Sequence, residues 1–238
     1  MTKKQMITIW DIDKTLYSGY VIIDSGKYLE SIGVFKNDFS KRIDTAQPSY
    51  KRGEVDYDEF AKTVYMIYGD NIFNKNQFEI LQLSKIFWDK SFSKIYKASY
   101  QLYNYLNVLG SDHAAISGSS FESLYYLLGR LSFSKMKSTE YETIDGNYTK
   151  KLVSTLVSHS DKSNLHGRVL NQKNKYQVLV GVGDNYADLA FLELVDYPII
   201  MGCNDTRLNA WASEVNALVV DDPSAIIGKG IFEEYISF

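Results

Sequence analysis

Short apolar segments recur along this chain, and each of them ends at polar residues. The first, Met6 to Trp10, is apolar and partly β-branched, and it ends abruptly at Asp11. Helical patterns lie between the segments, such as the one from Ser119 to Leu131, whose apolar residues recur every three or four positions. Strands that alternate with helices predict an α/β fold with a Rossmann-like parallel sheet covered on both faces. We expect the strands at Met6–Trp10, His113–Ile116, Val178–Val182, Pro198–Met201 and, with a weaker pattern, Ala217–Val220.

The alternation breaks between residues 18 and 91, where the sequence shows helical patterns and no convincing strand. Asp56 is placed to cap one helix, with Gly69 just past its end. A second helical pattern covers residues 78–86, and helix resumes from about residue 95 to 109. We therefore predict two domains, an α/β core of residues 1–17 and 92–238 and a helical cap domain of residues 18–91 inserted after the first strand.

The bulk composition argues against several classes of protein. The 238 residues carry a net charge of −3, whereas a general nucleic-acid binder usually has a strong basic excess. The one cysteine, Cys203, cannot form an intramolecular disulfide or a cysteine-based metal cluster. No apolar run is long enough to span a bilayer, and the first residues lack a signal-peptide pattern. We expect a soluble, cytoplasmic protein with neither a membrane nor a nucleic acid as its partner.

Polar residues directly follow three of the predicted strands. The carboxyl ends of the strands form the ligand-binding edge of an open parallel sheet, so we expect these side chains to converge. They are, in chain order, Asp11, Asp13 and Thr15, then Ser117 and Gly118, and then Gly183, Asp184 and Asp188.

The chemistry of this set favours phosphoryl transfer with Mg²⁺. Crowded carboxylates repel one another unless a cation lies between them. The strand ends offer oxygen ligands without histidine or cysteine, which favours Mg²⁺ over softer metals. A carboxylate can attack phosphorus and form an aspartyl phosphate while the metal screens the phosphate charge. The Ser117 hydroxyl, the amides of a helix start and a lysine would bind the remaining phosphoryl oxygens.

Three segments of the chain resemble motifs of the haloacid dehalogenase (HAD) superfamily. Asp11-Ile12-Asp13-Lys14-Thr15-Leu16 is similar to the first motif, Asp-x-Asp-x-Thr. Ile116-Ser117-Gly118-Ser119 is similar to the second motif, and Gly183-Asp184-Asn185-Tyr186-Ala187-Asp188 to the fourth. Asp145-Gly146-Asn147-Tyr148-Thr149 resembles the phosphoserine phosphatase-like branch, whose cap is a helical bundle inserted after the first motif. The resemblance covers nearly the whole chain and implies the core and cap described above.

The resemblance also implies a role for each acid. Asp11 would be the nucleophile, and Asp13 would protonate the leaving oxygen and then deprotonate the attacking water. Asp184 would bind Mg²⁺ together with Asp11 and the backbone carbonyl of Asp13. Asp188 would hold the metal site from behind these ligands or through water.

The same resemblance assigns the phosphate-binding residues. The branch places its third-motif lysine shortly before the fourth-motif strand, which indicates Lys162, with Lys151 as the competing candidate. The phosphoryl group would then be bound by Thr15, Ser117, Gly118 and Lys162.

The chain departs from the family pattern at Lys14, Tyr20 and Ala187 without losing a catalytic carboxylate. We therefore predict a Mg²⁺-dependent phosphatase that hydrolyses a small phosphorylated metabolite, a phosphomonoester, through an aspartyl phosphate. Tyr20 lies about where phosphoserine phosphatases carry a substrate-reading glutamate, which argues against phosphoserine and for a less charged or ring-bearing leaving group. Two alternatives stay open, a phosphotransferase that uses the same intermediate and a catalytically silent phosphate-binding or regulatory module.

Overall fold

The strand β1 (Met6–Trp10) lies in the middle of a seven-stranded sheet with the order β4-β3-β2-β1-β5-β6-β7. The computed structural model describes residues 5–156, 161–162, 176, 178–202 and 205–220, so the expectation for Cys203 lies outside the described residues. Among the described strands every neighbouring pair is parallel except β3 with β4. The other strands are β2 (Ser111–Ser120), β3 (Lys135–Ile144), β4 (Asn147–Ser154), β5 (Val178–Gly183), β6 (Tyr197–Met201) and β7 (Leu218–Val220). The α/β fold with a parallel sheet is confirmed, and so are all five predicted strands.

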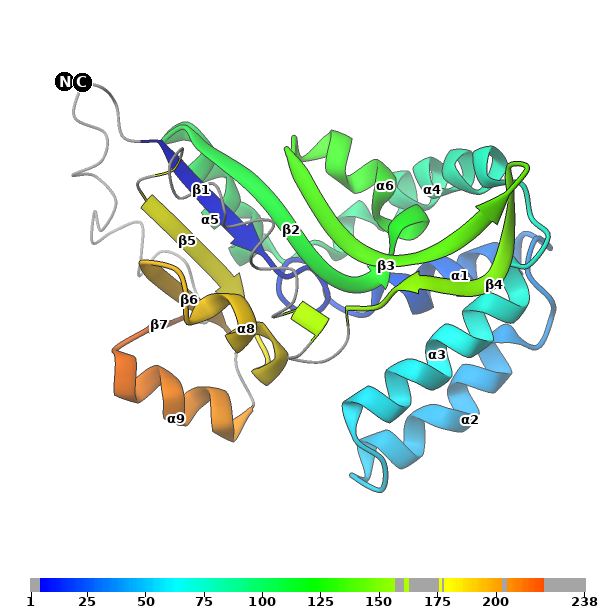
Figure 1. Ribbon diagram of the computed structural model, residues 1–238, viewed down its shortest axis with the longest axis horizontal. Coiled ribbons are helices and arrows are strands. Elements are labelled where there is room, and N and C mark those ends of the chain that lie inside the picture. The colour runs from blue at the N-terminus through cyan, green and yellow to red at the C-terminus, as the bar shows by residue number, and fades with distance from the viewer. Residues whose placement is uncertain (1–4, 157–160, 163–175, 177, 203–204, 221–238) are drawn as a thin grey trace.

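Helices cover both faces of this sheet (Figure 1). All five residues of β1 are buried, as expected for a central parallel strand. Met6 and Trp10 pack into one apolar cluster, whereas Ile7 and Ile9 pack into another on the opposite face. The covering elements are α5 (Lys97–Val108), α6 (Phe121–Arg130), α8 (Leu189–Leu192) and α9 (Thr206–Val215), with short 3₁₀ turns η1 (Phe92–Lys94) and η2 (Tyr186–Asp188).

The segment between β1 and β2 contains helices and, apart from isolated bridges, no strand, as the sequence predicted. Asp56 caps α3 by accepting a hydrogen bond from the Glu59 amide at 2.8 Å, which confirms the predicted start of that helix. The predicted end at Gly69 was wrong, because the helix continues to Ile72 and Gly69 packs against the ring of Tyr141. The helices are α1 (Val21–Ser31), α2 (Phe39–Lys51), α3 (Tyr57–Ile72) and α4 (Gln77–Ser91). Their assignment to a separate cap domain stays a prediction.

The hairpin of β3 and β4 was not predicted. Its two-residue loop, Asp145-Gly146, has both residues at positive φ (49° and 76°), the geometry of a tight hairpin turn. The hairpin curves away from the rest of the sheet toward α3 (Figure 1). There Tyr141 stacks on Tyr68 and donates a hydrogen bond to the carbonyl of Tyr65 at 2.7 Å. The hairpin therefore joins the sheet to the helices that precede it.

Among the described residues, none of the helices combines the length and the apolar character needed to cross a membrane.

Helices α1 and α2 meet at Gly26, where the structure leaves no room for a side chain. A Cβ built at this position would lie 2.2 Å from the ring of Phe39, which is fully buried. Glycine is therefore kept inside α1 for packing, although it is a poor helix former.

We expect Gly26→Ala to lower the free energy of unfolding by about 1–3 kcal/mol, because overpacking outweighs the gain of about 1 kcal/mol in helix propensity. Chemical denaturation measures the change. The matched control is Gly129→Ala in α6, where no atom lies within 4 Å of the added methyl group. That variant should be as stable as the wild type or slightly more stable. Equal stabilities of the two variants would contradict the packing argument.

Candidate active site

The end of β1 places Asp11 in the interior of the protein. The Asp11 amide donates a hydrogen bond to the carbonyl of Val182 at 2.9 Å, which continues the pairing of β1 with β5. The residue is 2% exposed, so its carboxylate has protein groups rather than bulk water around it. A buried carboxylate needs a compensating charge.

Lys162 supplies a compensating charge to Asp11. Its Nζ lies 2.8 Å from Oδ1 of Asp11 and 2.6 Å from Oδ1 of Asp188. Burial alone would lower the pKa of Lys162, but the two carboxylates raise it above its usual range, so the ammonium stays charged. The competing Lys151 is exposed and pairs with Glu142 at 2.7 Å. Lys162 is therefore the lysine that the structure brings to Asp11, and its contact with a phosphoryl group stays a prediction.

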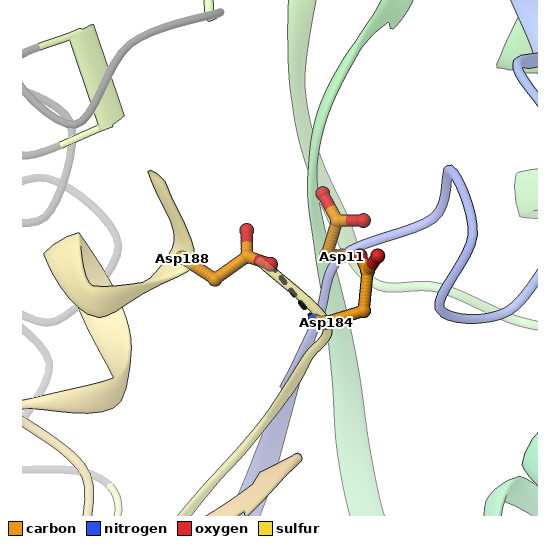
Figure 2. Close-up of side chains that lie close together, drawn as sticks. All are labelled: Asp11, Asp184 and Asp188. Carbon is orange, nitrogen blue, oxygen red and sulfur yellow. Dashed lines mark hydrogen bonds between the residues drawn. The ribbon is translucent and has the colours of Figure 1, made fainter. Parts of the chain in front are cut away.

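The loop after β5 brings two further acids to Asp11 (Figure 2). Asp188 Oδ2 accepts hydrogen bonds from the amides of Asp184 at 3.0 Å and Asn185 at 3.1 Å. Asp184 Oδ1 accepts a hydrogen bond from the Thr15 hydroxyl at 2.9 Å. The structure thus places Thr15 on an acid of the site, and the predicted contact of Thr15 with phosphate stays a prediction.

Asp11, Asp184 and Asp188 together fit a hard divalent cation. One carboxylate oxygen from each lies within 4.8 Å of the others. Asp11 Oδ2 is buried and has no hydrogen-bond partner in the part of the chain that the structure describes, so a cation would satisfy it. Both oxygens of Asp188 already accept hydrogen bonds from protein donors. This suits a residue that orients the groups around the metal rather than one that binds the metal directly. An all-oxygen donor set favours Mg²⁺.

The Asp13 side chain lies outside this cluster and has different partners. Its Oδ1 accepts a hydrogen bond from the Val21 amide at 2.7 Å, and its Oδ2 accepts one from the Ser117 hydroxyl at 3.0 Å. The Ser119 hydroxyl lies 2.9 Å and 2.8 Å from the two oxygens. These contacts orient the carboxylate, and the predicted metal contact through the Asp13 carbonyl stays a prediction.

Burial shifts the pKa of each central acid upward. Burial, and then the charge of Asp188, raise the pKa of Asp11 well above its usual range, and Lys162 opposes this shift. Burial and the charge of Asp188 raise the pKa of Asp184 to about 7. Burial also raises the pKa of Asp13, against the hydrogen bonds from Val21 and the two serines. The ionised carboxylates are therefore unfavourable together, and a bound cation would relieve their repulsion.

The groups packed around Gly118 leave little room for a side chain at this position. A Cβ at this position would lie 3.2 Å from the carbonyl of Leu156 and 3.2 Å from the hydroxyl of Tyr65. The Tyr65 hydroxyl donates a hydrogen bond to the Gly118 carbonyl at 2.6 Å, which connects α3 to the end of β2. A side chain at this position would have to displace one of these groups, and the predicted contact of Gly118 with phosphate stays a prediction.

The acids open into a cavity of about 670 Å³ that is bounded by both the sheet end and the preceding helices. Sequence reasoning gave no role to Ser119 or Asn185, although both belong to the quoted motifs. It expected cap tyrosines to join Tyr20 in the pocket but did not single out Tyr50 or Tyr57, which carry no local motif. The residues that line the cavity include Asp11, Asp13, Lys14, Tyr20, Tyr50, Asp56, Tyr57, Asp58, Gly118, Leu156, Lys162, Asp184, Tyr186, Asp205 and Arg207.

Comparison by sequence gives no match to a family model or to a curated protein. Comparison by structure does give matches. A protein of unknown function from Bordetella pertussis Tohama I has a TM-score of 0.75 and 16% identity, over 92% of this chain and 99% of that one. A phospho-aspartyl intermediate analogue of phosphoserine phosphatase has a TM-score of 0.64 and 13% identity, over 95% and 99%.

A third similar structure is cytosolic 5′-nucleotidase IIIB bound to cytidine, with a TM-score of 0.64 and 15% identity, over 98% of this chain and 85% of that one. A HAD family hydrolase and further phosphoserine phosphatases also match. The chain therefore shares the fold of these phosphoserine phosphatases and of the HAD family hydrolase, as the motifs predicted.

We expect Mg²⁺ to stabilise the folded protein, because the cation offsets the repulsion among the buried acids. A ligand at about 100 times its Kd adds about 2.7 kcal/mol to the free energy of unfolding. Thermal unfolding at pH 8, in Mg²⁺ and in EDTA, measures this gain. Asp184→Asn should lose it.

The same variant should be more stable than the wild type in EDTA. An acid whose pKa rises from 3.8 to about 7 on folding loses stability as the pH increases through that window, and asparagine does not titrate. Asp58→Asn is the control, because Asp58 lines the same cavity outside the acid cluster and should keep the Mg²⁺ gain. An unchanged Mg²⁺ gain in Asp184→Asn would rule out the assigned metal site.

Proposed function

We propose that this protein is a Mg²⁺-dependent phosphatase that hydrolyses a small phosphomonoester through an aspartyl phosphate on Asp11. The observation that carries the proposal is the environment of the Asp11 carboxylate. Oδ1 lies 2.8 Å from the Lys162 ammonium, and the buried Oδ2 has no hydrogen-bond partner among the described residues. A buried carboxylate next to a fixed positive charge is prepared to attack phosphorus.

The two acids of the first motif take separate steps. In the first step an Asp11 oxygen bonds to phosphorus while the bond from phosphorus to the leaving oxygen breaks, and Asp13 gives its proton to that oxygen. In the second step Asp13 removes a proton from water, the water oxygen attacks phosphorus, and inorganic phosphate leaves Asp11. The raised pKa of Asp13, caused by burial, suits a group that carries a proton in one step and accepts one in the next.

The remaining side chains would bind and orient the phosphoryl group. Mg²⁺ held by Asp11 and Asp184 would screen the charge of the phosphate from the attacking carboxylate. Lys162 is close enough to Asp11 to contact a phosphoryl oxygen, and Gly118 lines the same cavity. Ser117 lies beside the oxygen of Asp13, where the leaving group would depart.

The similar structures support this chemistry without choosing a substrate. One of them is described as a phospho-aspartyl intermediate analogue, and the substrate-bound phosphoserine phosphatase and the cytidine-bound nucleotidase act on chemically different leaving groups. We infer that the partner of this chain is a small phosphorylated metabolite whose leaving group is selected outside the acid cluster.

Asp11→Asn should abolish phosphate release while the protein stays folded. The substitution keeps the shape of the side chain but removes the nucleophile, so we expect a loss of about a thousandfold or more in kcat. The measurement is inorganic phosphate released from a panel of phosphomonoesters, with Mg²⁺ and with EDTA, and circular dichroism checks the fold.

The control variant is Asp58→Asn, which removes an acid from the same cavity outside the cluster and should retain most of the activity. Turnover of Asp11→Asn near that of the wild type would disprove the assigned nucleophile. Turnover that persists in EDTA would disprove the role of the metal.

A further inference from the structure

Tyrosines from three different elements form one side of the cavity. Tyr20 precedes α1, Tyr50 lies near the end of α2, and Tyr57 is the first residue of α3. Tyr20 stacks on Tyr57 with ring centroids 6.2 Å apart and 22° between the planes. Tyr50 stacks on Phe60 at 4.8 Å and contacts Tyr57 at 6.0 Å. We call Tyr20, Tyr50 and Tyr57 the tyrosine wall.

The tyrosine wall reaches the catalytic acids through Tyr57. The Tyr57 hydroxyl lies 3.8 Å from the point where a Cβ on Gly118 would be. It makes no hydrogen bond to the described residues that would hold it away from a ligand. Burial raises the pKa of Tyr57 well above its usual range, and the charges of Asp13 and Asp11 contribute to the shift. The phenol therefore stays neutral beside the place where the leaving group departs.

The residues around Asp13 on the side that faces α3 are mostly apolar or aromatic. A recess of about 20 Å³, room for about one water, continues from the main cavity between Asp13 and the start of α3. Besides Asp13, Gly118 and Ser119, its lining consists of apolar and aromatic side chains, namely Tyr20, Ile22, Ile23, Tyr57, Phe60, Ala61, Val64 and Tyr65. Apart from Asp13, no acidic or basic side chain of the described residues lines this recess, so a charged leaving group would lose its hydration here with few ionic partners to replace it.

Charged side chains also line the cavity, among them the acids Asp56 and Asp58 at the start of α3 and the cations Lys14 and Arg207. Arg207 pairs with Asp205 at 3.1 Å and lies over the ring of Tyr186 at 4.1 Å. The ammonium of Lys14 lies over the Tyr20 ring, 4.6 Å from its centre, on an exposed and movable side chain. The ring of Tyr20 is thus accessible to a group from the cavity, and a planar ring can take the place of that ammonium.

We propose that Tyr20 and Tyr57 are the leaving-group subsite and that the substrate is a phosphomonoester whose alcohol carries a neutral planar ring. This inference rests on the proposed function, because it assumes that Asp11 and Asp13 mark the reacting end of the substrate. A ring stacked on the tyrosine wall would place the ester oxygen near Asp13 and the phosphorus near Asp11.

The test compares benzyl phosphate with propyl phosphate and O-phosphoserine, since their alcohols are all primary and differ in the group that they carry. Calorimetry in Mg²⁺ on the Asp11→Asn protein measures binding without turnover. We expect benzyl phosphate to bind at least tenfold more tightly than either of the others, a free-energy difference of about 1.4 kcal/mol. Tyr20→Leu and Tyr57→Leu, each made in that background, should reduce the preference at least fivefold, whereas Tyr57→Phe should keep it because the ring remains.

Tyr125→Leu is the matched control, because this tyrosine is exposed on α6 and does not line the cavity. Equal affinities for benzyl and propyl phosphate, or tighter binding of O-phosphoserine, would overturn the inference, and so would an unchanged preference in both leucine variants. The kcat/KM values of the protein with Asp11 intact separate the two proposals. Ring-selective binding without any turnover would defeat the proposed function alone, and turnover without ring preference would defeat this inference alone.

Discussion

Two buried carboxylates and one half-buried carboxylate meet where β1 and β5 end, and the Lys162 ammonium lies 2.8 and 2.6 Å from the two buried ones. Their mutual repulsion is the constraint on which the rest of the site depends. The fold tolerates it by supplying donors: the lysine to Asp11, two backbone amides to Asp188, and the Thr15 hydroxyl to Asp184. These donors do not compensate the acids fully. Asp11 Oδ2 has no hydrogen-bond partner among the described residues, and the pKa of Asp184 is raised to about 7. A divalent cation and a phosphoryl group are the ligands that would complete this compensation.

The helices between β1 and β2 determine what can approach this charge cluster. Helix α3 is attached on two sides, to the end of β2 through the hydrogen bond from Tyr65 to the Gly118 carbonyl, and to the β3–β4 hairpin through Tyr141. These contacts hold α3 against the sheet, and Tyr57, its first residue, lines the cavity together with Asp11 and Asp13. Charged residues at the sheet end and aromatic residues of the helices thus line the same cavity, and we propose that the first perform catalysis and the second select the leaving group.

The sheet-end residues could be predicted because their signals are local. Asp11 and Asp184 each follow a short apolar strand, and parallel topology brings such strand ends together. The β3–β4 hairpin was missed because its strands are polar, although Asp145-Gly146 between alternating residues is a recognised turn signal. The end of α3 was placed at Gly69 because glycine often ends a helix, but contact with Tyr141 accounts for this glycine. The lysine was the hardest assignment, since its partner Asp11 lies 151 residues away and no periodicity marks such a pair. The tyrosine wall combines the residue before α1 with residues of α2 and α3, and it likewise has no local signal.

The central claim is that the Asp11 carboxylate accepts the phosphoryl group, and beryllofluoride tests it without knowledge of the substrate. Beryllofluoride imitates a phosphoryl group bound to a carboxylate, and fluorine NMR distinguishes the bound from the free form. With Mg²⁺ present, we expect a bound signal in the wild type that is absent in Asp11→Asn and retained in Asp58→Asn. A bound signal of the same intensity in Asp11→Asn, or no bound signal in the wild type, would contradict it.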